Sequence, residues 1–253
     1  MIPEIEFKEN ARKFNVPISS IERDYAQSWL LAHLPKMAFK GGTGIRKAYI
    51  DNYRFSDDLD FTLLDNPTIS RLKSKIQKAL HETRDESGIS FLDDLKSEEV
   101  KNGYVFVVYF RILRTSGDPL KIKMDITKKE NEIIFNPVQK RGILHIYSDK
   151  INEHIKAYTL EEMFAEKVRS LFERTRPRDL YDVWYLNKKM TFDKSLFQKK
   201  CIYKKVEPNI DELITRKPNY EKTWKASLQH QLPELPSATD VFDNVIDFLK
   251  KIL

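Results

Sequence analysis

The sequence has a single cysteine, Cys201, and only seven glycines in 253 residues. One cysteine excludes a disulfide framework and a cysteine-based zinc site. No run of residues approaches the roughly eighteen apolar residues that a membrane-spanning helix needs. The first residues include acids where a secretory signal would have a basic and then an apolar stretch. We therefore expect a cytoplasmic protein with no membrane segment.

Charged residues are plentiful, with 44 Lys and Arg against 38 Asp and Glu, a net charge of +6. Such a balance permits a polyanionic partner without requiring one. Residues 188–225 alone supply the excess. Five aromatic residues are threaded through this segment: Phe192, Phe197, Tyr203, Tyr220 and Trp224. Two interpretations stay open: a solvated helical surface with aromatic side chains packed inward, or a groove for a nucleic-acid backbone with bases stacked on the rings.

The apolar periodicity predicts an α+β half, residues 1–150, followed by a helical half, residues 151–253. Ser19 and Glu22 form a capping box that would start one helix, and Thr159 and Glu162 form another. Pro177 suits the first turn of a further helix, and Pro208, Pro218 and residues 233–236 would break the rest. Helices are predicted at 19–34, 69–83 and 159–174, and strands at 59–64, 104–113, 120–126, 133–138 and 143–148. No flexible linker separates the halves, which favours two packed lobes with a cleft.

Two carboxylates, Asp58 and Asp60, stand two residues apart on a predicted strand and therefore point to the same face. Adjacent like charges are unfavourable unless a positive charge lies between them. All-oxygen ligation suits Mg²⁺ or Mn²⁺, so a metal site is one interpretation. A solvated strand end is the other.

A glycine cluster, residues 40–44, lies between a predicted strand and a predicted helix start. Lys40, Gly41, Gly42 and Thr43 there would let backbone N–H groups and a hydroxyl approach a phosphate. The spacing is neither that of a Walker A loop nor that of a dinucleotide fingerprint, and a plain tight turn is the alternative.

A glycine loop followed by two acids on the next strand is the layout of a nucleotidyl-transfer site. Such a site usually needs a third carboxylate from a neighbouring strand. Asp125 fits, because it lies on the polar face of the alternating strand 120–126. We therefore predict Asp58, Asp60 and Asp125 as metal ligands.

Four blocks in order resemble the AbiEii/MenT nucleotidyltransferase toxin family over residues 18–190. The blocks are residues 21–25, residues 39–49 with 54–61, residues 161–169 and residues 174–182. The resemblance implies a DNA polymerase β-like fold, with an N-terminal mixed sheet flanked by helices and a C-terminal helical lobe that completes the active-site cleft. It implies an NTP substrate, a tRNA 3′ end as acceptor, and an antitoxin encoded nearby. It also places Gly42 and Thr43 in the phosphate loop, and Ser56 before the acids.

The later blocks carry Lys167 and Asp179, which the resemblance implies in nucleotide or catalytic contacts. Lys167, Arg174 and Arg178 have near-helical spacing, so a basic stripe could meet a triphosphate. The alternative is an interhelical network of ion pairs, which we favour for Asp182, whereas we favour function for Lys167. Two other functions stay open: a catalytically degenerate module that binds RNA or antitoxin, and transfer to a protein or a small molecule.

Overall fold

A computed structural model describes residues 1–253 as two compact units, Met1–Tyr158 and Thr159–Leu253. The division falls later than the predicted boundary at residue 150. The reason is β8 (His154–Ala157), which pairs in parallel with β1 (Ala38–Lys40) and so belongs to the sheet of the first unit. No helix is long and apolar enough to cross a membrane.

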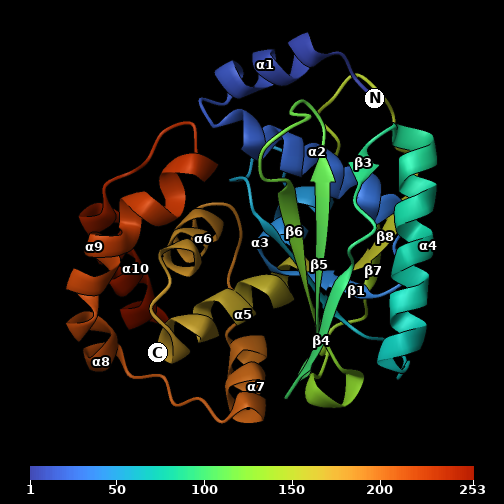
Figure 1. Cartoon of the computed structure of the whole chain (residues 1–253). Coiled ribbons are helices and arrows are strands. Elements are labelled where there is room, and N and C mark those ends of the chain that lie inside the picture. Colours follow the sequence, from blue (N-terminus) through green and yellow to red (C-terminus); the bar gives the residue numbers. More distant parts are fainter. The chain divides into compact units, whose positions relative to one another are not determined.

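The first unit is built on one eight-stranded mixed sheet (Figure 1). The strand order is β3-β5-β6-β2-β1-β8-β7, and β4 also pairs with β5. The remaining strands are β2 (Asp58–Thr62), β3 (Ser90–Phe91), β4 (Lys96–Val100), β5 (Gly103–Arg111), β6 (Leu120–Thr127) and β7 (Gln139–Gly142). Strand β2 runs parallel to β6 and antiparallel to β1, so the acid-bearing strand is central.

Four helices belong to this unit: α1 (Glu4–Lys13), α2 (Ile18–His33), α3 (Gly41–Ala48) and α4 (Ile69–Ser87). The buried helix α2 contacts α1 and α4, and it also packs on β6 and β8. Alternation along β6 buries Ile122, Met124 and Ile126, and leaves Lys123 and Asp125 on the opposite face. The sheet therefore has one apolar face and one face that carries charged side chains.

The second unit is helical, as predicted. Its helices are α5 (Leu160–Glu173), α6 (Pro177–Asn187), α7 (Lys194–Lys204), α8 (Ile210–Thr215), α9 (Lys217–Leu228) and α10 (Ala238–Ile252). Thr159 caps α5 by accepting a hydrogen bond from the Glu162 N–H at 3.2 Å, which confirms that capping box. The rings of Phe164 and Phe248 are buried in this unit, and the half-buried ring of Phe192 packs against both.

Several local predictions are wrong. Ser19 does not cap α2, because the helix begins at Ile18 after Pro17. Pro218 lies in the first turn of α9, where proline is tolerated, so the predicted break falls just before it, between α8 and α9. Residues 133–138 and 143–148 form no strands. The second of these segments packs on helices instead: the Leu144 N–H donates to the Lys47 carbonyl at 2.8 Å, and the Tyr147 hydroxyl donates to the Ile21 carbonyl at 3.0 Å.

Candidate active site

The glycine loop and the acid-bearing strand are in direct contact. Gly41 has a φ of +75°, a conformation that side chains with a Cβ rarely adopt. A Cβ on Gly41 would lie 2.2 Å from Oδ2 of Asp60, far inside contact distance. Glycine is therefore required here twice, once for the backbone turn and once because the Asp60 carboxylate occupies the adjacent space.

The second glycine of the loop packs against the segment that precedes the acids. A Cβ on Gly42 would lie 2.6 Å from Nη2 of Arg54 and 3.2 Å from Oγ of Ser56. The structure thus brings Ser56 to the loop, as predicted from its place before the acids. It also adds Arg54, a buried guanidinium to which we had given no role.

Thr43 is completely buried, and its hydroxyl donates to the backbone carbonyl of Asp58. This bond ties the first turn of α3 to the start of β2. In this conformation the hydroxyl holds the acid strand against the loop and does not reach solvent, where a phosphate would lie.

The register of the sheet places charged residues of neighbouring strands side by side on the face that carries charged side chains. Asp60 pairs with Lys40 of β1 on one side and with Asp125 of β6 on the other. Asp58 pairs with Lys123, whose ammonium lies 2.8 Å from Oδ2 of Asp125. The predicted third carboxylate is therefore at the strand position directly beside Asp60.

The three acids match a divalent cation in donor type and in strand position, since neighbouring strands are only about 4.8 Å apart. Their side chains do not yet converge: residues 1–253 contain no group of three or more His, Cys, Asp or Glu side chains arranged to hold a metal ion. Asp125 is instead paired with Lys123.

Lys40 is a predicted nucleotide contact whose ammonium is already engaged. It lies 3.4 Å from Oε2 of Glu132 and 5.4 Å from the centre of the Tyr158 ring. The side chain is only 13% exposed. Lys40 therefore contributes its backbone, which lies beside Asp60, to the site.

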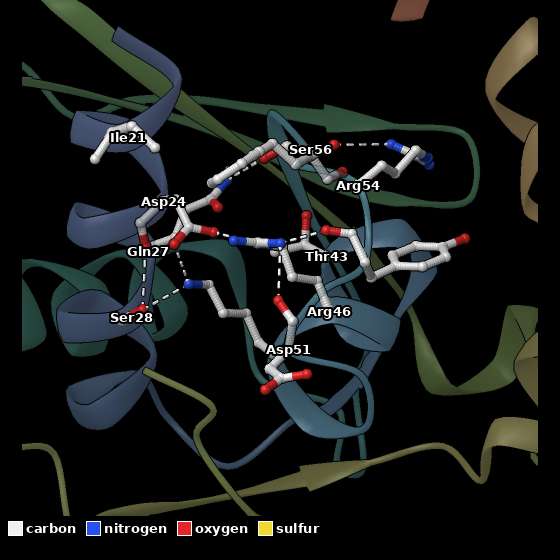
Figure 2. A network of polar contacts seen from close by, with 12 residues as sticks. Ile21, Asp24, Gln27, Ser28, Thr43, Arg46, Asp51, Arg54 and Ser56 are labelled. Carbon is white, nitrogen blue, oxygen red and sulfur yellow. Dashed lines mark hydrogen bonds and ion pairs between the residues drawn. The ribbon is translucent and has the colours of Figure 1, made fainter. Parts of the chain in front are cut away.

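A buried network behind the loop fixes α3 to α2 (Figure 2). Asp24 of α2 accepts from Nε of Arg46 at 2.6 Å and lies 2.7 Å from Nζ of Lys47. Burial opposes ionisation of Asp24, but the charges of Arg46 and Lys47 outweigh it and hold the pKa of that carboxyl well below its ordinary value. Nη1 of Arg46 also donates to the carbonyl of Asp51 at 3.1 Å, which anchors the turn after α3.

Two further residues of α2 hold the segment that leads into the acids. The amide nitrogen of Gln27 donates to the carbonyls of Ser56 and Asp57 at 3.0 and 3.1 Å. Nη1 of Arg23 lies 2.7 Å from Oδ1 of Asp57. Sequence reasoning missed these positioning roles. For Arg23 the available signal was the block at residues 21–25, which carried the resemblance but had been assigned no role, whereas Gln27 lies outside that block.

In the second unit Lys167 and Asp179 do meet, inside a buried ion network between α5 and α6. Nζ of Lys167 lies 2.8 Å from Asp179 and 2.7 Å from Asp182, and Nε of Arg174 lies 2.8 Å from Asp179. Burial is outweighed by the Lys167 and Arg174 charges, which keep the pKa of Asp179 well below its ordinary value. The predicted basic stripe is wrong, because α5 ends at Glu173 and Arg174 is extended.

The basic segment 188–225 is exposed at most of its lysines, but not at Lys200. Lys200 is fully buried, with its ammonium 2.7 Å from Glu162 and 2.9 Å from Glu166. Phe197, Tyr220 and Trp224 are buried, so they pack inward and offer no faces to bases. Lys199 and Lys205 remain exposed. For Phe197, Tyr220 and Trp224 this confirms the first interpretation, a solvated helical surface with aromatic side chains packed inward.

The class of protein follows from the mixed sheet, the glycine loop on α3 and the acid row, which together are the layout of a nucleotidyltransferase. The solved structure of MenT4, a nucleotidyltransferase toxin from Mycobacterium tuberculosis, is similar with a TM-score of 0.70 at 16% identity, over 100% of this chain and 90% of that chain. JHP933 from Helicobacter pylori matches with a TM-score of 0.59 at 17% identity, over 94% and 93% of the two chains. No functionally curated protein sequence matches this chain.

The family model described as "Nucleotidyl transferase AbiEii toxin, Type IV TA system" matches residues 25–248. The chain therefore belongs to the AbiEii family of nucleotidyltransferase toxins. The resemblance that four short blocks indicated extends through most of the helical unit.

Proposed function

We propose that this nucleotidyltransferase transfers a nucleotidyl group from an NTP to the 3′ end of a tRNA, with help from a divalent metal ion. The observation that carries the proposal is the contact of Asp60 with Gly41, because it joins a phosphate-binding loop to the acid row. In the reaction the acceptor hydroxyl oxygen forms a bond to the α-phosphorus of the NTP. The bond from that phosphorus to the bridging oxygen breaks, and pyrophosphate leaves.

The loop supplies the triphosphate site in this proposal. Helix α3 has no acidic residue in its first turn and no side-chain cap at Lys40. The N–H groups at this end and the positive end of the helix dipole favour an anion. Lys40, Gly41 and Gly42 provide this backbone, while Arg54 and Ser56 pack against it. Thr43 fixes the loop to β2 through the bond from its hydroxyl to the Asp58 carbonyl.

Asp58, Asp60 and Asp125 would hold the metal ion, Mg²⁺ or Mn²⁺. A divalent cation bound there would neutralise charge on the phosphates and favour ionisation of the attacking hydroxyl. The chain's own contribution is to hold the three carboxylates on one sheet face beside the loop.

Lys167 and Asp179 enter the proposal as positioning residues of the second unit. The Lys167 side chain is only 12% exposed and is shared by two carboxylates, so its charge is used within the network. The expectation that Lys167 contacts the nucleotide directly stays a prediction. The network fixes α5 against α6, the two helices that carry the later sequence blocks.

The test is incubation of the pure protein with each labelled NTP, Mg²⁺ and total RNA, followed by identification of what becomes labelled. Label on the tRNA 3′ end supports the proposal, and label on protein or a small molecule would transfer the same chemistry to another acceptor. No label from any NTP would favour the degenerate binding module. Membership in a type IV family further leads us to propose a cognate antitoxin, whose co-expression should relieve toxicity.

A further inference from the structure

The sheet face that carries Asp58, Asp60 and Asp125 continues past β6 onto β5. In the antiparallel register of these two strands Val105 lies directly opposite Asp125. Side chains of paired residues point to the same face of a sheet, and every second residue of a strand points the same way. Three successive side chains of β5 therefore lie on the face of the acids, and we call them the β5 strip: Val105, Val107 and Tyr109.

The β5 strip is largely apolar and partly accessible to solvent. Its three side chains are half-buried, whereas the alternate residues of β5 are buried in the opposite face. Helix α2 packs on β6 and lies behind β5 and β6 in Figure 1. Because Phe110 of the apolar face lines a cavity together with Ile18 of α2, this helix covers the face opposite to the strip. A tyrosine ring and two valines that are partly exposed form a surface against which a nucleobase can pack.

One end of the β5 strip is flanked by lysines. Lys96 of β4 pairs with Val107, and its ammonium lies 5.1 Å from the centre of the Tyr109 ring. The Lys96 side chain is 60% exposed, so a base that packs on this ring displaces only a solvated chain. Lys121 of β6 pairs with Tyr109 from the other side and is exposed. An RNA phosphate beside the ring would therefore meet positive charge from both neighbouring strands.

The other end of the β5 strip is acidic. Val105 lies between Asp125 of β6 and Glu98 of β4, which is exposed. Asp94 lies 3.9 Å from Lys96, but both of these side chains are more than half exposed, so the pair offsets the lysine only weakly. The strip thus has a basic end and an acidic end. An RNA phosphate is favoured at the basic end, and an uncharged hydroxyl is favoured at the acidic end.

The strand order places the β5 strip on the side of the acids that is opposite to the glycine loop. Lys40, which leads into the loop, lies beside Asp60, and Asp125 and then Val105 follow across the sheet. In phosphoryl transfer the attacking and leaving oxygens lie roughly in line on opposite sides of the phosphorus. With pyrophosphate leaving at the loop, the attacking hydroxyl approaches from the β5 side.

We propose that the β5 strip binds the 3′ end of the acceptor RNA, with the terminal hydroxyl toward Asp125 and the preceding phosphates at Lys96 and Lys121. The inference rests on the proposed function, because it assigns a subsite to its acceptor. Val105 and Tyr109 are four residues apart, about 13 Å along a strand, so the strip has room for the last two nucleotides. The base of the NTP would find the same apolar surface, and the experiment separates these two occupants.

The experiment measures binding of a fluorescent RNA hairpin with a short single-stranded 3′ overhang to the full chain without NTP. The same hairpin with a blunt end is the reference. Tyr109→Ala removes the ring, and Tyr109→Phe keeps it. Lys121→Gln removes one charge, and Lys75→Gln is its matched control, because Lys75 is exposed on α4, a helix that packs on α2. Thermal unfolding midpoints identify a variant that has lost its fold, and Tyr109→Leu replaces Tyr109→Ala in that case.

We expect Tyr109→Ala to weaken binding of the overhang hairpin about tenfold, because one aromatic stacking contact is lost. Tyr109→Phe should recover most of this binding. The blunt hairpin should bind more weakly than the overhang hairpin, and Tyr109→Ala should change its affinity little. Lys121→Gln should flatten the salt slope by about 0.7, the value for one phosphate contact on a single strand, whereas Lys75→Gln should leave the slope unchanged.

Two results would overturn the assignment: overhang binding that neither Tyr109→Ala nor Lys121→Gln weakens, and equal losses for the two hairpins. Where transfer occurs, Tyr109→Ala should raise KM for RNA and leave KM for NTP unchanged. The reverse pattern would assign the β5 strip to the base of the NTP instead. Because binding is measured without NTP, absence of transfer leaves the binding result interpretable, and the two proposals fail separately.

Discussion

Two clusters of charged residues differ in exposure, although both include residues from blocks that resemble the same family. In the first unit Asp58, Asp60 and Asp125 are half-buried on the open face of the sheet. In the second unit Asp179 and Asp182 are 3% and 0% exposed, and each accepts the Lys167 ammonium. Charge at a characteristic spacing therefore does not identify a ligand site by itself. Access to solvent separates residues that can meet a substrate from residues that hold helices together.

The energetics of the two clusters differ for the same reason. Removing one partner from a buried ion pair leaves an uncompensated charge and costs about 3–5 kcal/mol. Removing one acid from a half-exposed row relieves repulsion and costs little stability. Substitutions in the acid row should therefore mainly lower activity, whereas substitutions in the buried network should mainly lower stability.

The largest expected effect is on activity. Asp60→Asn keeps the shape that packs against Gly41 but removes a charge that a divalent cation requires. Several kcal/mol of transition-state stabilisation would be lost, so we expect turnover to fall by about 10³-fold or more. Initial rates with the preferred NTP check this. Near-normal turnover would show that Asp60 is not a ligand, and an unchanged urea midpoint would confirm that the fold is intact.

The next effect is on stability in the second unit. Lys200→Glu would place a third carboxylate beside Glu162 and Glu166, fully buried. We expect a loss of at least about 3–5 kcal/mol in the free energy of unfolding. Urea denaturation measures it, with Lys199→Glu as the control on the same helix. Because Lys199 is exposed, its reversal should stay within about 0.5 kcal/mol. Equal effects of the two reversals would contradict the burial of Lys200.

A smaller effect is a pH dependence in the network behind the loop. The pKa of Asp24 is lowered in the folded chain, so its stabilisation is present above the unfolded value near 3.8 and is lost as pH falls. Asp24→Asn should therefore cost most at pH 7, and the difference from the unaltered chain should shrink by about 1 kcal/mol between pH 5 and pH 3. Urea midpoints at pH 7, 5 and 3 check this. Asp65→Asn, an exposed acid, should show no such trend.

The smallest effect concerns the basic surface of α7 and its end. Reversal of Lys199, Lys204 and Lys205 to Glu, with Lys200 left intact, tests whether this surface contacts RNA. If it does, RNA affinity should fall and the salt slope should flatten by about 0.7 per lost contact on a single strand. NTP binding should not change, since the glycine loop belongs to the other unit. A reversed chain that binds RNA normally would leave these lysines as a solvated face.

The sequence determined the α+β half, the helical half and the acid motif, because these depend on local patterns. Alternation in β6 places Asp125 on the polar face, and the order of Gly41, Gly42, Asp58 and Asp60 survives any packing. The same local logic predicted strands at 133–138 and 143–148. It failed at 143–148 because apolar residues can be buried against helices as well as in a sheet, and at 133–138 the segment is not buried and Ile133 is exposed. Short apolar runs do not distinguish these two environments.

Tertiary structure alone decided which charges are paired and buried. Lys199 and Lys200 are neighbours in the same helix, yet one is solvated and the other lies between two carboxylates of α5. Asp24 of α2 meets Arg46 and Lys47 of α3 only because these two helices pack against each other. The register that sets Asp60 between Lys40 and Asp125 is also a long-range result. The local sequence pattern fixes the face of the helix or strand on which a residue lies. Its charge state and its partner depend on which residues from other parts of the chain pack against that face.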